Sequence, residues 1–238
     1  MDVMANKAEH SSSPHKQVKH VIHEVEHYKQ RFNWDCGVAC VIMVLNQEQR
    51  EEMLTNFEKI CEEEGFGQST WTIDLCFLLK RFNVKHRMHT TLLGVNEDYK
   101  RHGYYNHIID MDKDRVRRRF VEAPSSDIQV VESYLSMEDI IEHLSTHGPV
   151  ILLVDAGLLV CDLCKHNKLK YEFRRCFGGG YAGHYVLVVG AHAASRRLLY
   201  RDPALRARLC AAPARRLDAA RAAPGTDRDL LLVFKDFR

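Results

Sequence analysis

The chain has 238 residues, enough to bury one substantial core. Hydrophobic residues make up 45% and charged residues 28%, which is ordinary for a globular protein, and the net charge of +2 supplies no strong field for nucleic acid. The longest apolar stretch, residues 150–161, is interrupted by Asp155 and is shorter than the roughly 18 to 20 residues that a membrane span needs. Nucleic-acid and membrane partners are therefore not expected.

Residues 1–17 carry charges, histidines and a Ser-Ser-Ser-Pro run without an apolar core. We expect a disordered tail there rather than a secretory signal, followed by one domain over residues 18–238. Eight cysteines in a chain without a signal favour reduced thiols over a disulfide framework. The expected location is the cytoplasm, with the nucleus as an alternative.

The first part of the domain is predicted to be helical. Alternating apolar residues between 18 and 30 indicate an extended segment, after which Asp35 is placed to cap a helix over residues 37–45. The continuous apolar run of that helix predicts burial nearly all round. Two more helices should pack on it, one over residues 48–64 and one over residues 72–81, with Trp71 as a staple residue in front of its cap.

The second part of the domain is predicted to be mostly strands. Ser136 and Asp139 have the spacing of a capping box, which indicates a helix start between two strands. Because helices come first and strands later, we expect an α+β fold, in which N-terminal helices pack on a mostly antiparallel sheet. The predicted strands cover residues 84–93, 128–134, 150–154, 184–190, 197–202 and 230–234, the later helices cover 113–123, 136–147 and 217–222, and a cysteine-containing insertion lies at about 157–182.

Cys36 is the candidate nucleophile, because it lies where the first helix begins. A helix N-terminus offers unpaired backbone N–H groups and a dipole that favours the thiolate form. A histidine must complete the activation, and only His184 stands at the mouth of a long apolar strand. Cys40, one helical turn further on, is expected in the core.

A hairpin supplies the remaining members of the predicted site. If the strands 184–190 and 197–202 form a hairpin centred on Ala193, His184 faces Asp202 across the ladder. Asp202 would then orient the imidazole, as the third member of a catalytic triad does. Gln30, six residues before Cys36, is close enough for its amide to join the Cys36 backbone N–H in an oxyanion hole.

These motifs resemble known families. Gln30 with the Asn-Trp-Asp-Cys-Gly-Val-Ala-Cys block at 33–40 resembles papain-like enzymes, and more closely the C39-type bacteriocin-processing peptidases, whose histidine and aspartate segments resemble Gly-His-Tyr at 183–185 and Arg-Asp-Pro at 201–203. A closer resemblance, from about residue 20 to the end, is to the eukaryotic guanylyl cyclase domain-containing protein family. Its motifs here are Trp-Asp-Cys-Gly at 34–37, Trp-Thr-Ile-Asp-Leu at 71–75, Thr-Leu-Leu-Gly at 91–94, Cys-Asp-Leu-Cys at 161–164, Gly-His at 183–184 and Gly-Thr-Asp-Arg-Asp at 225–229.

The resemblance implies a papain-like, C39-type fold, whereas the family name implies cyclisation of GTP. The motif residues favour thiol chemistry, so the expected function is hydrolysis of an amide or thioester-like acyl bond by Cys36, His184, Asp202 and Gln30. The alternatives are the guanylyl cyclase of the name and a catalytically silent binding module. The expected partner is a protein or peptide, and no cofactor is assigned.

Other motifs are weaker. Cys161 and Cys164 have the spacing of a zinc knuckle, with His166 and Cys176 as further candidate ligands, but a second such pair is missing. Metal binding and a flexible basic loop are equally consistent with this pattern, so no metal is assigned.

Two charged runs receive plain interpretations. Asp110, Asp112 and Asp114 lack the glycine and glutamate of a calcium loop and are expected in a solvated acidic turn. The arginines at 115 and 117–119 are expected on the exposed face of a helix. Neither run therefore supports a cyclase. The sequence also lacks a lysine-containing phosphate loop.

Overall fold

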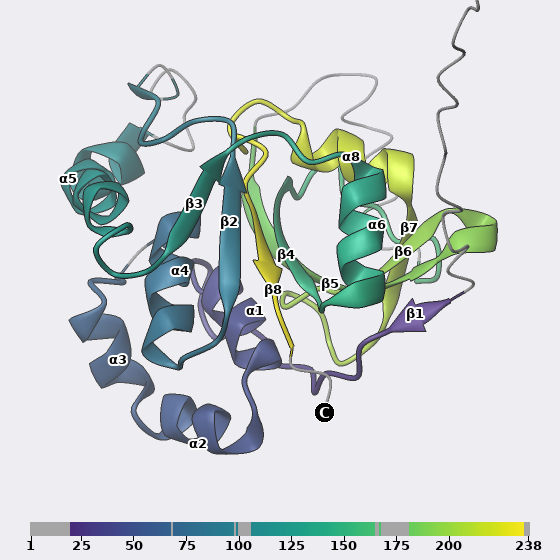
Figure 1. Ribbon diagram of the computed structural model, residues 1–238, viewed down its shortest axis with the longest axis horizontal. Helices are drawn as coiled ribbons and strands as arrows, with labels where there is room; N and C mark the ends of the chain where they lie inside the picture. The colour runs from purple at the N-terminus through teal and green to yellow at the C-terminus, as the bar shows by residue number, and fades with distance from the viewer. Residues whose placement is uncertain are drawn as a thin grey trace, which may run out of the picture.

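The computed structural model describes residues 20–67, 69–97, 99, 106–164, 167 and 181–235, so the tail expected at 1–17 lies outside it. Its strands are β1 (Val21–Ile22), β2 (His86–Thr90), β3 (Gln129–Glu132), β4 (Val150–Asp155), β5 (Gly183–His192), β6 (Arg197–Arg201), β7 (Cys210–Pro213) and β8 (Leu230–Val233). They form one sheet in the order β3-β2-β8-β4-β5-β6-β7, with β1 paired to β5 (Figure 1). β2 and β3 are parallel and the other pairs antiparallel, which confirms an α+β fold with a mostly antiparallel sheet.

Helices cover both faces of the sheet. Along β5, Tyr185 and Leu187 join a core with α1 and α4, whereas Val186 and Val188 join a second core with α6 and α8. This alternation follows from the two-residue period of a strand. The helices are α1 (Cys36–Val44), α2 (Gln47–Thr55), α3 (Phe57–Glu63), α4 (Thr72–Arg81), α5 (Asn106–Glu122), α6 (Met137–Thr146) and α8 (Ala214–Arg221).

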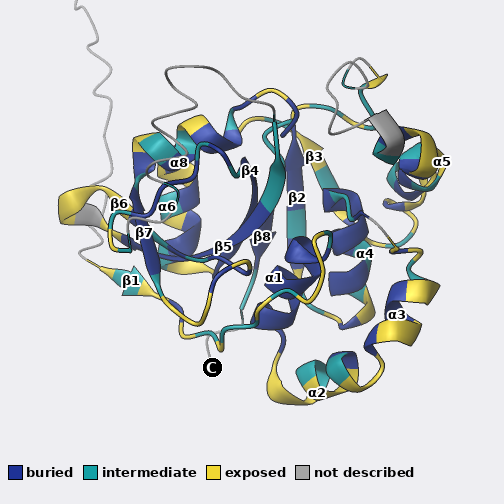
Figure 2. Cartoon of the chain, turned by 180° about the vertical axis from the view of Figure 1, so that it is seen from behind, coloured by how far each residue is buried: buried dark blue, intermediate teal, exposed yellow. Residues whose placement is uncertain are grey.

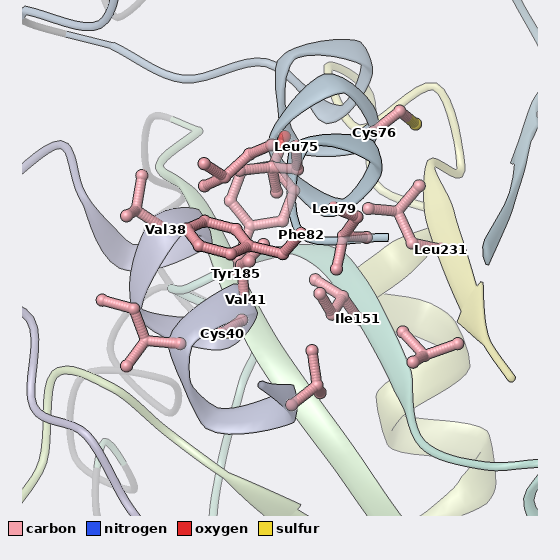
Figure 3. Close-up of a cluster of buried hydrophobic side chains, with 14 of the residues drawn as sticks. Val38, Cys40, Val41, Leu75, Cys76, Leu79, Phe82, Ile151, Tyr185 and Leu231 are labelled. Carbon is pink, nitrogen blue, oxygen red and sulfur yellow. The ribbon is translucent and has the colours of Figure 1, made fainter. Parts of the chain in front are cut away.

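α1 is the most deeply buried helix, as its apolar sequence predicts. All nine of its residues are buried, and Figure 2 shows it in dark blue while α2 and α3 expose much of their surface. Val38 and Val41 pack beside Tyr185 of β5 and Leu75 of α4 (Figure 3). The helix that carries Cys36 is therefore fixed between α4 and the sheet.

The helix predicted over residues 48–64 is two helices. Asn56 interrupts it with φ −107° and ψ 23°, ending α2 and preceding α3. Its side-chain amide donates to the Glu52 carbonyl at 3.1 Å, an alternative to continued helix that asparagine offers readily. Gly65, at φ +71°, then follows α3 in the left-handed conformation expected after a helix.

α5 confirms the exposed face expected for Arg117 and Arg118, but it places Asp112, Arg115 and Arg119 differently from the prediction. Asp112 is not in a solvated turn; it is buried within α5 and accepts a hydrogen bond from the Trp71 indole at 2.9 Å. Arg115 ion-pairs with Asp74, and Arg119 lies 3.0 Å from the same carboxylate and is buried. The sequence does not predict these inward-facing charges, because their partner Asp74 lies on α4, which is distant in the chain and packs against α5 only in the folded protein.

Most later elements match the prediction, with differences at their ends. Ser136 and Asp139 form the predicted capping box of α6. Trp71 occupies the N-cap position of α4 itself rather than the position before it, and its backbone N–H donates to Asp74. β7 was not predicted, because its small residues lie in an Ala/Arg-rich stretch without a strand pattern. Among the described helices, none has the length and apolar character needed to cross a bilayer.

Candidate functional site

His184 and Asp202 lie together, although the predicted register was wrong. His184 Nε2 and Asp202 Oδ1 are 2.8 Å apart. The ladder pairs Leu187 with Arg201 and His192 with Arg197, and it shifts register between Val188 and Gly190. Asp202 therefore follows the last paired residue of β6 and reaches His184 from the loop, rather than across the ladder.

The loop that holds Asp202 is fixed by backbone hydrogen bonds. Asp202 Oδ1 also accepts from the Ala204 N–H at 3.0 Å, and the Pro203 carbonyl accepts from the Gln30 N–H at 3.0 Å. His27 Nε2 lies 3.0 Å from the Leu205 carbonyl. The segment before α1 thus holds the aspartate loop in place beside the histidine.

Cys36 is the first residue of α1, and α1 packs directly on β5, which carries His184. The thiol hydrogen-bonds to the His184 imidazole, and with Nε2 engaged by Asp202 this leaves Nδ1 for sulfur. The Cys36 side chain is nearly buried, with 7% of the residue exposed. The structure therefore brings Asp202, His184 and Cys36 into one hydrogen-bonded series.

The charge of His184 is set by these contacts. Burial lowers its pKa, but the hydrogen bonds to Asp202 and Cys36 outweigh burial and raise the pKa to about 10. At neutral pH the imidazole therefore carries a positive charge between the Cys36 sulfur and the Asp202 carboxylate.

Gln30 and Asp35 are engaged differently from the prediction. The Gln30 amide donates to the Phe32 carbonyl at 2.6 Å, and its Oε1 is buried without a hydrogen-bond partner. Asp35 stands at the N-cap of α1 but makes no side-chain cap bond; its carboxylate accepts from the Arg31 and Phe32 N–H groups, each at 2.9 Å. Asp35 thus shapes the turn before Cys36 and leaves the helix N–H groups to other acceptors.

A pocket of about 160 Å³ opens beside Cys36. Segments far apart in sequence build it: the turn before α1, the start of α4, the start of α5, β4, the start of β5, and the turn before β8. The residues lining it are Asn33, Trp34, Cys36, Ser69, Thr70, Trp71, Thr72, Ile108, Leu153, Tyr181, Gly183, Tyr185, Gly225, Asp227 and Asp229.

Asp227 and Asp229 are site residues that sequence reasoning missed. Burial raises the pKa of Asp229 to about 8, an effect that the nearby hydroxyls of Thr72 and Thr90 oppose only in part, and Asp229 Oδ1 is buried without a hydrogen-bond partner. Asp227 accepts from the Tyr99 hydroxyl at 2.7 Å and has φ +47°. In the sequence, the Gly-Thr-Asp-Arg-Asp motif serves only as a resemblance to a family. Its two aspartates, which flank an arginine just before an apolar strand, are the pattern that could have predicted two carboxylates in the site.

The cysteine-containing insertion is described only in part. Cys161 and Cys164 gather with Cys210 of β7, their Sγ atoms within 4.8 Å of one another. His166 and Cys176, the other predicted ligands, lie outside the described residues. This cluster is in the core on the sheet face opposite Cys36.

The fold and the site together define an α+β protein in which a cysteine at a helix N-terminus is hydrogen-bonded to a histidine–aspartate pair. A family model described as "Guanylylate cyclase" matches residues 25–233. Guanylyl cyclase 1 of Arabidopsis thaliana is 32% identical over 219 residues, which is 88% of this chain and 75% of the relative. The chain belongs to this guanylylate cyclase family.

Proposed function

We propose that the protein is a papain-like, C39-type cysteine hydrolase that cleaves an amide or thioester-like acyl bond. The observation that supports this most directly is the hydrogen-bonded series from Asp202 through His184 to Cys36 at the start of a buried helix. Nucleophile, base and orienting group are the parts that acyl transfer through a thiol requires.

In the proposed reaction the Cys36 thiolate attacks the substrate carbonyl carbon and forms a carbon–sulfur bond. The His184 imidazolium then gives its proton to the leaving group as the acyl bond breaks. Water, deprotonated by the neutral imidazole, hydrolyses the acyl-enzyme and restores the thiolate–imidazolium pair. Asp202 holds the ring orientation through Nε2 and stabilises its positive charge in each step.

The oxyanion of the tetrahedral intermediate needs hydrogen-bond donors. The Cys36 backbone N–H belongs to the first turn of α1, where N–H groups have no acceptor within the helix. Gln30 becomes a second donor in this proposal once its amide leaves the Phe32 carbonyl. The substrate we propose is a protein or peptide, because the site lies beside an open pocket lined with aromatic residues.

Guanylyl cyclase activity is the second candidate. The name of the Arabidopsis relative favours it, and Asp227 and Asp229 place two carboxylates in the same pocket, the groups that would hold a divalent ion. Against it, the described lining contains no lysine or arginine to contact a triphosphate. Asp229 would also have to release a proton to bind a cation, since its pKa is raised to about 8.

Thiol labelling tests the hydrolase proposal. Wild type, Cys36→Ala and Cys61→Ser are incubated with a thiol-directed acyl probe, and labelled peptides are mapped; Cys61 is the control because it is also a nearly buried helical cysteine. Label should appear on Cys36 in wild type and Cys61→Ser only. Burial raises the pKa of Cys40 and Cys76 well above 9, so these should stay unlabelled. Labelling of Cys36 no faster than an average thiol between about pH 5 and 8 contradicts the proposal.

GTP turnover separates the alternatives. The same proteins and Asp229→Asn are incubated with GTP and Mg²⁺ or Mn²⁺, and cyclic GMP is measured. We expect slow formation that does not depend on Cys36. A fast metal-dependent rate that copurifies with the protein and is lost in Asp229→Asn, but not in Cys36→Ala, establishes the cyclase instead. Rapid labelling of Cys36 without turnover of any acyl substrate supports the silent binding module.

A further inference from the structure

Three cysteines converge on the sheet face that carries α6 and α8. Cys161 and Cys164 follow β4, and Cys210 opens β7, about 50 positions later in the chain. Their Sγ atoms all lie within 4.8 Å of one another. Cys161 and Cys210 are buried, and Cys164 is partly exposed. In the sequence the Cys-x2-Cys pair has no further paired cysteines, and the fold supplies a third thiol from a distant strand.

Backbone donors surround the central sulfur. The Cys164 N–H donates to Cys161 Sγ at 3.4 Å, and the Ala211 N–H donates to it at 3.5 Å. Hydrogen bonds of this kind favour the thiolate, the form in which cysteine binds a metal. One donor comes from the Cys-x2-Cys turn and the other from β7, so the two halves of the cluster are held together without a cross-link.

The turn between Cys161 and Cys164 is fixed from outside as well. The Asp162 N–H donates to the Ala211 carbonyl at 2.8 Å. The Asp162 carboxylate lies 2.9 Å from Arg216 of α8 and 3.3 Å from Arg197 of β6. The carboxylate is thereby committed to arginines, and sulfur remains the donor atom of the cluster.

We propose that Cys161, Cys164 and Cys210 form a structural zinc site. Three soft sulfur donors around one point select Zn²⁺ among common divalent ions, and a Cys-x2-Cys turn is a typical half of such a site. Among the described residues, these three cysteines supply three of the four ligands that a tetrahedral zinc ion takes. Zinc tethers the segment after β4 to β7 and takes no part in the chemistry of Cys36, which lies in the other core.

Metal content tests the site directly. The full chain is purified under reducing conditions, and its zinc and iron contents are measured by inductively coupled plasma mass spectrometry. We expect about one zinc per chain, lowered about tenfold or more in Cys161→Ser, Cys164→Ser and Cys210→Ser. Cys61→Ser is the matched control, a buried cysteine outside the cluster that should keep its zinc. Cys164→Ser should leave the fold intact, because the Cys164 side chain is partly exposed, so zinc loss in this variant is not explained by misfolding.

Cobalt gives a second readout. After zinc is removed with a chelator, added Co²⁺ should produce a thiolate-to-cobalt absorption in wild type and Cys61→Ser, weakened in each cluster variant. Three results overturn the proposal: wild type that binds no zinc when reduced and supplied with it; zinc retained in folded Cys164→Ser and Cys210→Ser alike; or iron in place of zinc. A disulfide within the cluster, seen as two missing hydrogens in the intact mass, also overturns it.

Discussion

His184 shows how contacts decide the state of a single residue. A buried imidazole on its own would lose its charge, because burial penalises the charged form. Hydrogen bonds to Asp202 and Cys36 reverse that tendency and raise the pKa to about 10. The histidine that we propose as the base and proton donor therefore depends on two neighbours from different elements.

The Asp202 variants test this dependence. Asp202→Asn keeps an oxygen that can accept from His184 Nε2, whereas Asp202→Ala removes the acceptor. Acyl-probe labelling of Cys36 should fall about 10- to 100-fold in the alanine variant and less in the asparagine variant. Both variants lose the carboxylate that helps raise the pKa of His184. The imidazolium should therefore lose its proton at a lower pH than in wild type. The pH above which labelling declines should fall accordingly.

Stability is the control for these variants. Neither substitution removes a core methylene, so each should cost less than the roughly 2 to 5 kcal/mol of a large core truncation. Wild-type labelling in both folded variants would show that another group orients His184.

At the scale of elements, β1 links the start of the domain to the site. It pairs Val21 with Ala191 and Ile22 with Gly190, and the His23 N–H donates to the Val189 carbonyl at 2.7 Å. The chain then continues to His27 and Gln30, whose contacts fix the Asp202 loop. A two-residue strand thus sets where the aspartate loop is held.

Gly190→Ala tests the role of β1. An added Cβ would overlap the Val21 carbonyl oxygen and stand 3.0 Å from Ile22 Cα, so the backbone of one strand must move. We expect the free energy of unfolding in urea to fall by about 1 to 3 kcal/mol and amide exchange at 21–23 to accelerate. Gly67→Ala is the control, because its Cβ would meet nothing within 4 Å. Equal stability and unchanged exchange in the two variants would contradict this role.

At the scale of the whole molecule, one sheet separates two hydrophobic cores, and each core carries a different group of cysteines. The core with α1 and α4 carries Cys36 and borders the pocket, and the core with α6 and α8 carries the cysteine cluster. β8 lies inside the sheet between β2 and β4, and the turn before it brings Asp229 into the pocket. A buried carboxyl there links the stability of the entire fold to pH.

Asp229→Asn measures that link. The folded-state pKa of Asp229 is about 8, above its ordinary 3.8, so the folded protein keeps a proton that the unfolded chain releases. Its stabilising contribution is complete below about pH 3.8 and is lost as pH rises through about 8. Asp229→Asn should therefore gain about 1 to 3 kcal/mol over wild type between about pH 5 and pH 8.5 in urea unfolding.

The control for this measurement is Asp114→Asn, an exposed carboxylate on α5 that should leave the pH profile unchanged. Parallel pH profiles of Asp229→Asn and wild type would show that Asp229 is ionised in the folded protein.

The sequence alone determined the features that depend on neighbouring residues. The apolar run that became α1, the capping box at Ser136 and the apolar strands β4 and β8 all carry short-range patterns. Cys36 was identified by its place before that run, and His184 by its place at the mouth of a strand. These predictions rest on periods of two and about 3.6 residues, which any chain segment displays by itself.

Only the tertiary structure decided the features that join distant segments. The β5–β6 register depends on the shift between Val188 and Gly190, beside which β1 pairs, and hairpin symmetry cannot show it. Arg119 faces inward because Asp74 is there to meet it, and Cys210 reaches Cys161 because β7 lies beside their turn. Desolvation and charge pairing act between residues far apart in sequence, so the direction of a side chain is settled by what packs against it.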